Sequence, residues 1–211
     1  MLEILYQDQA LVVCVKPFRV LSTDEPGGMP DLIRQAKVRT VHRLDQVVGG
    51  LMVYGLTGHA ASELSRQIRE DQFQKEYQAV VHWRPQYDAG TYIDLLGRNE
   101  KTRKTYVAKV PGKGIQQAVL HYRLLDNRQG FSLVEIRLET GRTHQIRAQF
   151  SARGMPLAGD RKYSKYPDPP SWQIALWSSH LAFTHPETGE AMDFRLSPPA
   201  TEPWTLFQNT L

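Results

Sequence analysis

One stretch in the first third of the chain combines a carboxylate with basic residues and glycines. It reads VHRLDQVVGGLMVYG, residues 41–55, and it places Asp45 two residues after Arg43 and shortly before a strongly apolar run. A single Asp in such a position either caps a turn or acts as an acid, base or nucleophile. Asp45 is therefore a candidate catalytic residue, and its role depends on which other side chains the fold brings to it.

Two further stretches carry side chains of the kind that active sites use. The stretch KEY, residues 75–77, puts a tyrosine on an expected strand, and ETGRTHQIRAQ, residues 139–149, carries Arg142, His144 and Arg147 around the start of an expected helix. Backbone N–H groups at a helix start, together with two arginines, could bind an anion. Taken singly, the tyrosine packs on a sheet and the arginines are surface charges, so both interpretations remain open.

Positive charge is concentrated in residues 98–113. The run contains Arg98, Lys101, Arg103, Lys104, Lys109 and Lys113, against Glu100 alone. Such a run is either a solvated hairpin or loop, or an extended ribbon that lies along a phosphate backbone. The net charge of the whole chain, +4, permits a polyanionic partner without requiring one.

Other classes of site are not indicated. His42 and His144 have no cysteine or acidic partner at metal-ligand spacing, so no metal is expected. The chain has no G-x-S-x-G stretch and no G-x-G-x-x-G or Walker loop, which argues against a serine triad and a nucleotide cofactor. No apolar run approaches ~18 residues and no signal peptide is evident, so we expect no membrane span. With its single cysteine, Cys14, in an apolar run, the chain is expected to be cytoplasmic.

The elements that must position these residues are mainly strands. Strands are predicted at residues 2–6, 10–16, 50–56, 73–82, 118–125, 131–138, 176–183 and 191–196. Residues 22–30 should form a loop, Thr57 should cap a helix to about Asp71, and a short helix should run from near Thr143 to Gly154. Short connections favour an α+β fold with a mixed, largely antiparallel central sheet flanked by a few helices and loops, in one domain over residues 1–211.

Taken together, these segments resemble the RluA-type RNA pseudouridine synthases. The resemblance rests on HRLD (42–45), KEYQA (75–79), GRTHQIR (141–147) and GDRKY (159–163), in that order, and it extends over nearly the whole chain. It implies the pseudouridine synthase fold and an isomerase that converts a specific uridine of structured rRNA or tRNA to pseudouridine. It also implies that the reaction needs neither a metal nor a cofactor, and we expect a monomer.

The same resemblance implies roles for individual residues. Asp45 matches the catalytic aspartate, Tyr77 the tyrosine that packs against the target base and helps to remove its C5 proton, and Arg147 the basic residue that pairs with the aspartate. The residues expected to bind RNA are Arg43, Arg142, His144, Lys101, Arg103 and Lys104.

The chain departs from the family pattern at three places. Val48 and Gly49 stand where Thr-Ser is usual, so two hydroxyls near Asp45 are missing, and Leu-Trp-Ser at residues 176–178 replaces a frequent Leu-His-Ala. An N-terminal S4-like domain is not expected. Because the Asp45 loop is altered, an RNA-binding or RNA-folding protein with reduced or lost catalysis remains the alternative, and a hydrolase that uses Asp45 is a more distant one.

Overall fold

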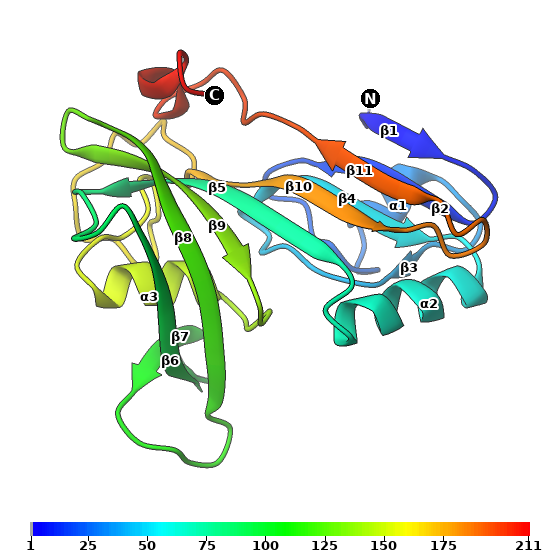
Figure 1. Cartoon of the computed structure of the whole chain (residues 1–211), viewed down its shortest axis with the longest axis horizontal. Helices are drawn as coiled ribbons and strands as arrows, with labels where there is room; N and C mark the ends of the chain where they lie inside the picture. Colours follow the sequence, from blue (N-terminus) through cyan, green and yellow to red (C-terminus); the bar gives the residue numbers. More distant parts are fainter. Residues whose placement is uncertain (1) are drawn as a thin grey trace. The chain divides into compact units, whose positions relative to one another are not determined.

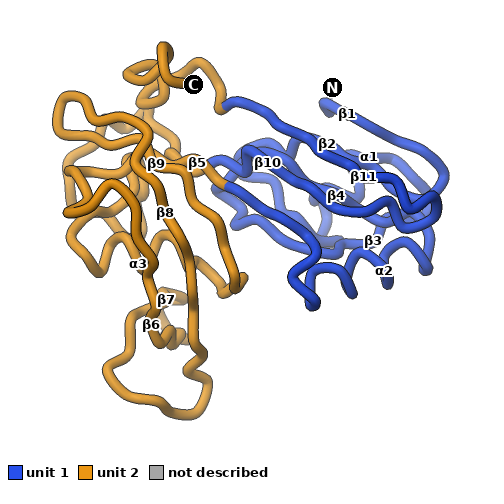
Figure 2. Tube along the Cα trace, viewed as in Figure 1, with its two compact units in different colours: residues 1–76, 177–197 blue, residues 77–176, 198–211 orange. Residues whose placement is uncertain are grey.

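The chain divides into two compact units (Figures 1 and 2). The computed structural model describes residues 2–211. Unit 1 holds the chain up to Glu76 together with Trp177–Ser197, and unit 2 holds Tyr77–Leu176 and Pro198–Leu211. The chain passes from one unit to the other inside β5 (Gln74–His82), after the first residue of β10 (Leu176–Thr184) and again after Ser197. A single domain over residues 1–211 stays a prediction.

Unit 1 is built on strands in the order β1-β2-β4-β10, where β1 is Ile4–Gln7, β2 is Leu11–Lys16 and β4 is Gly49–Gly55. The short β3 (Arg39–Thr40) pairs with β4, and β11 (Ala191–Arg195) pairs with β10. The β4–β10 pair is parallel, whereas β1–β2, β2–β4, β3–β4 and β10–β11 are antiparallel. Inward-facing apolar residues of these strands form one core, to which Leu11, Val13, Leu51, Val53 and Leu181 belong.

Two helices complete unit 1. In α2 (Gly58–Arg69), Thr57 acts as the predicted N-cap, because its hydroxyl accepts a hydrogen bond of 3.0 Å from the Ala60 N–H. Leu64 turns into the core from this helix. The loop predicted over residues 22–30 is wrong at its end, since α1 (Met29–Ile33) already begins after Gly28 with a proline in its first turn.

Unit 2 contains strands in the order β5-β9-β8-β6-β7, with β6 Ala89–Asn99, β7 Lys104–Ala108, β8 Gln116–Arg128 and β9 Phe131–Leu138. The neighbours from β9 to β7 are antiparallel. Helix α3 (Gln145–Ala152) packs on β6 and β8, where Ala148 contacts the buried Leu96 and Ala118. A short 3₁₀ helix, η1 (Trp204–Phe207), lies near the C-terminus. Strand β6 was not predicted from the sequence. The basic run, residues 98–113, begins at the end of β6, continues through the turn and β7, and ends in the loop after β7.

The predicted fold class is confirmed. The chain is α+β, with a mixed and mostly antiparallel sheet and few helices, and the predicted strands recur within a few residues of their expected bounds. Cys14 is buried in β2, as a core residue should be. Among the residues that the structure describes, no helix is both long and apolar enough to cross a membrane.

Candidate active site

Asp45 lies on a tight turn that leads into β4. Its carbonyl accepts a hydrogen bond of 2.9 Å from the Val48 N–H, and its side chain is half-buried. The preceding residue, Leu44, is held on both sides by the buried Ser22, whose hydroxyl donates to the Leu44 carbonyl (2.9 Å) and accepts from its N–H (3.0 Å). The hydrogen bonds of Val48 and Ser22 therefore fix the backbone on both sides of the Asp45 side chain.

A fully buried lysine supports the same turn. The Lys16 ammonium, at the end of β2, donates to the carbonyls of Pro17 (2.9 Å), Val20 (2.6 Å) and Gln46 (3.2 Å). Burial lowers the pKa of Lys16 to about 8, while the negative charge of Asp45 opposes that shift. Lys16 thus ties the loop after β2 to the residue that follows Asp45. Sequence analysis missed this role, although a lysine ending a wholly apolar strand was the available signal.

The two residues of the His-Arg pair before Asp45 differ in role: His42 holds the backbone of β4, and Arg43 lies on the surface. The His42 Nε2 accepts a hydrogen bond of 3.1 Å from the Val53 N–H of β4. Burial and, next, the nearby charge of Lys75 lower the pKa of His42 to about 3, so this imidazole is neutral at pH 7. Arg43 is exposed and lies in the field of Glu25. Residues 2–211 contain no group of three or more His, Cys, Asp or Glu side chains suited to a metal.

The double glycine after the turn is required by close packing. A Cβ added at Gly49 would lie 2.7 Å from the Trp177 ring and 3.2 Å from the Lys16 carbonyl. Gly50 has φ +115, and a Cβ there would lie 2.4 Å from the Ser178 carbonyl. The serine expected at position 49 is therefore sterically incompatible with the tryptophan at position 177. Two departures from the family pattern, far apart in the sequence, prove to be in contact.

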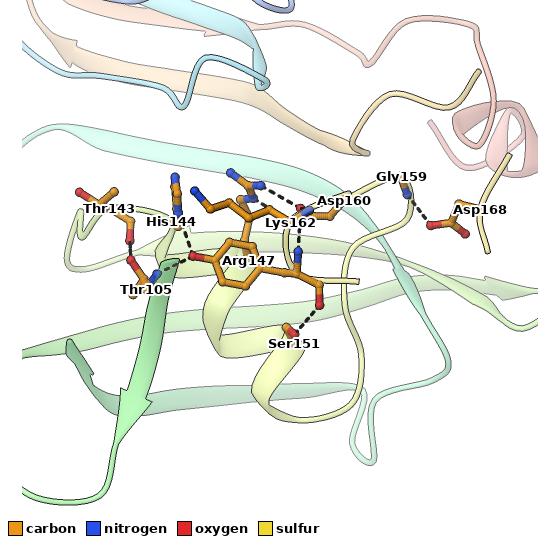
Figure 3. A network of polar contacts seen from close by, with 10 residues as sticks. Thr105, Thr143, His144, Arg147, Ser151, Gly159, Asp160, Lys162 and Asp168 are labelled. Atoms are coloured by element: carbon orange, nitrogen blue, oxygen red, sulfur yellow. Dashed lines mark hydrogen bonds and ion pairs between the residues drawn. The ribbon is translucent and has the colours of Figure 1, made fainter. Parts of the chain in front are cut away.

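In unit 2, Arg147 is buried in a two-point ion pair (Figure 3). Its Nε and Nη2 each lie 2.8 Å from one carboxylate oxygen of Asp160, which is itself 1% exposed. The same carboxylate accepts from the backbone N–H groups of Lys162 (3.0 Å) and Tyr163 (3.2 Å). A fork-on-fork pair of this kind fixes the plane of the guanidinium as well as its position. Sequence analysis quoted the GDRKY stretch but did not predict that Asp160 binds Arg147.

The segment before α3 differs from the expected anion site. The helix begins at Gln145 rather than near Thr143, because His144 adopts the left-handed conformation with φ 55. The Arg142 N–H donates to the Gln145 side chain (3.0 Å), so the prediction of free N–H groups is wrong at this position. The exposed Arg142 guanidinium also donates to the Gln117 carbonyl (3.0 Å).

Tyr163 connects the basic hairpin to the start of α3 through Thr105 and His144, which Figure 3 labels. Its hydroxyl accepts from the Thr105 N–H (2.7 Å) and lies 2.8 Å from the His144 Nδ1, while the Thr105 hydroxyl donates to the Thr143 carbonyl (2.8 Å). The Lys104 ammonium lies 5.9 Å from the centre of the Tyr163 ring. Residues from the hairpin, the segment before α3 and the GDRKY stretch therefore meet in one network.

The structure brings several of the predicted site residues together within unit 2. This unit contains the buried Tyr77 on β5, the Arg147 ion pair and the exposed hairpin residues Lys101, Arg103 and Lys104. Asp45 belongs to unit 1, so its pairing with Arg147 stays a prediction.

The fold is α+β with a mostly antiparallel sheet, and comparison with known proteins identifies the class as RNA pseudouridine synthases. A model of the RNA pseudouridylate synthase family matches residues 29–152. The chain is 34% identical over 208 residues to an uncharacterized RNA pseudouridine synthase, YlyB, of Bacillus subtilis, covering 92% of this chain and 68% of that protein. It is 34% identical over 206 residues to the dual-specificity RNA pseudouridine synthase RluA of Haemophilus influenzae, covering 92% and 91%.

Another relative is the ribosomal large subunit pseudouridine synthase D of Haemophilus influenzae, with 32% identity over 219 residues, 92% of this chain and 66% of that protein. Among solved structures, human RNA pseudouridylate synthase domain containing 1 shares the fold, with a TM-score of 0.82, 22% identity and coverage of 95% and 85%. The chain belongs to the RNA pseudouridylate synthase family, whose members are isomerases that convert uridine in RNA to pseudouridine. The predicted family is confirmed.

Proposed function

We propose that this protein isomerises a specific uridine of structured RNA, with Asp45 as the catalytic aspartate. The observation that carries the proposal is the HRLD turn, which lies inside the matched family region and whose backbone is fixed by Ser22, Lys16 and Val48. These contacts hold the backbone on both sides of Asp45, which supports a defined position for its carboxylate. A surface cap would not need a buried lysine behind it.

The reaction requires three events at one nucleotide. The N1–C1′ bond breaks, the detached uracil turns, and C5 bonds to C1′ while the C5 proton leaves and N1 gains one. Atoms and electrons balance within the nucleotide, so the proposal invokes no redox cofactor. Whether Asp45 attacks C1′, attacks C6 or removes the C2′ proton is left open by the proposal.

We assign supporting roles to two residues of unit 2. Tyr77 would provide a wall against which the loose uracil packs, and Arg147 would keep the aspartate ionised, since an opposite charge favours the ionised carboxylate. Support for the second role comes from Asp160, which holds the Arg147 guanidinium in one orientation. Preorganised charge of this kind is more effective than a mobile side chain.

RNA binding is assigned to exposed basic residues. These are Arg43, Arg142, Lys101, Arg103 and Lys104, with the partly buried His144 beside them. Phosphate contacts from such residues would offset the cost of extruding the target base, which is a few kcal/mol for a stacked nucleotide. Relatives are named for large-subunit ribosomal RNA and for dual specificity, so rRNA is the first substrate to test and tRNA the second. A monomer that works in the cytoplasm stays a prediction.

The test compares wild type with Asp45→Asn on RNA that lacks pseudouridine. We expect site-specific pseudouridine with wild type, and a loss of turnover of at least about a thousandfold in the variant. RNA affinity should change by no more than about twofold, because the substitution removes no cation. Chemical mapping of pseudouridine and a binding titration measure the two quantities. RNA binding without product from wild type would instead establish the non-catalytic alternative.

A further inference from the structure

An exposed tryptophan in a strained conformation follows β5 directly. Trp83 has φ +64, in the left-handed region that glycine occupies freely and that a bulky residue occupies only at a cost in free energy. Its side chain is nevertheless 53% exposed, so the free energy gained by burying the ring offsets only part of the backbone strain. Strained residues with exposed side chains are found where the side chain has a task beyond packing.

The indole is held in place although it is exposed. Its Nε1 donates a hydrogen bond of 2.8 Å to the Tyr166 hydroxyl. The Trp83 N–H donates to the Gly130 carbonyl (2.7 Å), and its carbonyl accepts from the Ser132 hydroxyl (2.8 Å). Because both its backbone and its ring are anchored, little side-chain entropy remains to be lost when a ligand binds to the ring.

Tyr166, the partner of this indole, stands on a buried polar network. Its ring stacks on His82 with the centroids 4.4 Å apart, and His82 lies 3.0 Å from a carboxylate oxygen of Asp168. Asp168 in turn accepts from the Gly159 N–H at 2.8 Å (Figure 3). The network joins the two exposed rings to Gly159, the residue that precedes Asp160, so Tyr166 is held from below by buried polar groups.

Positive charge flanks both rings. Arg84 follows Trp83 and Lys165 precedes Tyr166, and both side chains are exposed. Arg84 also lies 2.6 Å from the exposed Asp88 carboxylate, so Lys165 is the stronger candidate for a phosphate contact. The acidic residue closest to Tyr166 in the sequence, Asp168, is buried. Aromatic faces flanked by cations are the combination with which proteins bind single-stranded nucleic acid, since each base offers a π-face and each phosphate a negative charge.

We propose that Trp83 and Tyr166 form a stacking site for an unpaired nucleobase of the RNA substrate, in addition to the residues assigned to catalysis. The proposal rests on the proposed function only in taking RNA as the ligand. A base would stack on the exposed face of the indole, and its phosphates would lie toward Arg84 and Lys165. The site would add affinity for RNA and leave the chemical step unchanged.

The decisive variant is Trp83→Gly, because glycine fits the backbone and removes the ring. We expect the Kd for an RNA that wild type converts to rise about fivefold to tenfold, while turnover at saturating RNA is unchanged. The melting temperature should not fall, since the strain at φ +64 disappears. Trp83→Phe should keep most of the affinity, and Tyr87→Ala, which removes another exposed aromatic of unit 2, should leave the Kd unaltered.

Two further measurements separate stacking from structure. The slope of log Kd against log salt should be the same for Trp83→Gly and wild type, because no cation is lost. Wild type should also prefer oligouridylate to an abasic oligomer of equal charge, and the preference should be several-fold smaller in the variant, where only the catalytic site still binds a base. An unchanged Kd, or a preference as large in the variant as in wild type, would overturn the proposal. If wild type binds RNA through Trp83 but forms no pseudouridine, the stacking site stands and the proposed catalysis fails.

Discussion

The turn that carries Asp45 and the segment that carries Arg147 are stabilised in different ways. The Asp45 turn is held through its backbone, by the Val48 N–H, the Ser22 hydroxyl and the Lys16 ammonium. In the Arg147 segment, the main contact is a buried ion pair with Asp160 through two nitrogens. The backbone at Asp45 is therefore held by hydrogen bonds, whereas at Arg147 the charged side chain itself is held, by Asp160.

The difference has a consequence for mutagenesis. Asp45 can be replaced by asparagine with its turn kept, because asparagine retains the backbone carbonyl that accepts from the Val48 N–H and has nearly the same shape. Arg147 cannot be removed so cleanly, because its loss leaves the buried Asp160 carboxylate without the guanidinium that binds it. Activity lost in an Arg147 variant would thus mix chemistry with stability, and the contrast itself is best tested through Asp160.

The largest effect is expected for Asp160→Ala. Removing one member of a buried ion pair leaves a charge that is poorly compensated, so the free energy of unfolding should fall by about 3–5 kcal/mol. Urea denaturation measures the change. Glu135→Gln, which breaks the exposed Arg123–Glu135 pair, should cost less than about 1 kcal/mol. If Asp160→Ala costs no more than Asp45→Asn, the two regions are not stabilised differently.

A smaller loss is expected for Gly49→Ala. The added Cβ would overlap the Trp177 ring, and overpacking of this kind costs about 1–3 kcal/mol. In a Trp177→Leu background the same substitution should cost less, because the overlapping ring is gone. A double-mutant cycle in urea gives this coupling. Gly58→Ala, where a Cβ would meet nothing within 4 Å, serves as the matched control, and equal costs in both backgrounds would contradict the assignment.

The smallest effect is the dependence of stability on pH through His42. Its pKa is about 3 in the folded protein and 6.5 unperturbed, so below pH 6.5 the unfolded chain takes up a proton that the folded protein does not. Stability from this residue is complete above pH 6.5 and falls with decreasing pH, by about 1 kcal/mol between pH 6 and 5. His42→Gln should lack this component. Parallel stability curves for the two proteins would show that His42 is not buried in its neutral form.

The fold could be predicted from the sequence wherever one local pattern determined one element. Thr57 and the apolar stripe after it gave α2, and apolar runs gave β2 and β4. Strand β6 was missed because Gly90 and Gly97 interrupt its pattern. At each of these glycines, a tyrosine ring from the neighbouring strand fills the space that a side chain would need. This packing becomes evident only once the strand pairs are known.

The site was predictable to the extent that short motifs name residues, and not where contacts join distant segments. HRLD and GRTHQIR led to the family, which the comparisons confirm. No spacing rule joins Arg147 to Asp160, or Gly49 to Trp177, since those contacts depend on how loops and strands meet. The roles of Asp45, Tyr77 and Arg147 in catalysis remain predictions that the experiments above address.

The contact between Gly49 and Trp177 also restricts the order in which substitutions can accumulate. A side chain larger than hydrogen at position 49 meets the Trp177 ring, so a substitution there costs least once residue 177 has become smaller. The opposite order passes through the overlapping pair and loses about 1–3 kcal/mol of stability on the way. The order of the two substitutions therefore sets the stability of the intermediate protein.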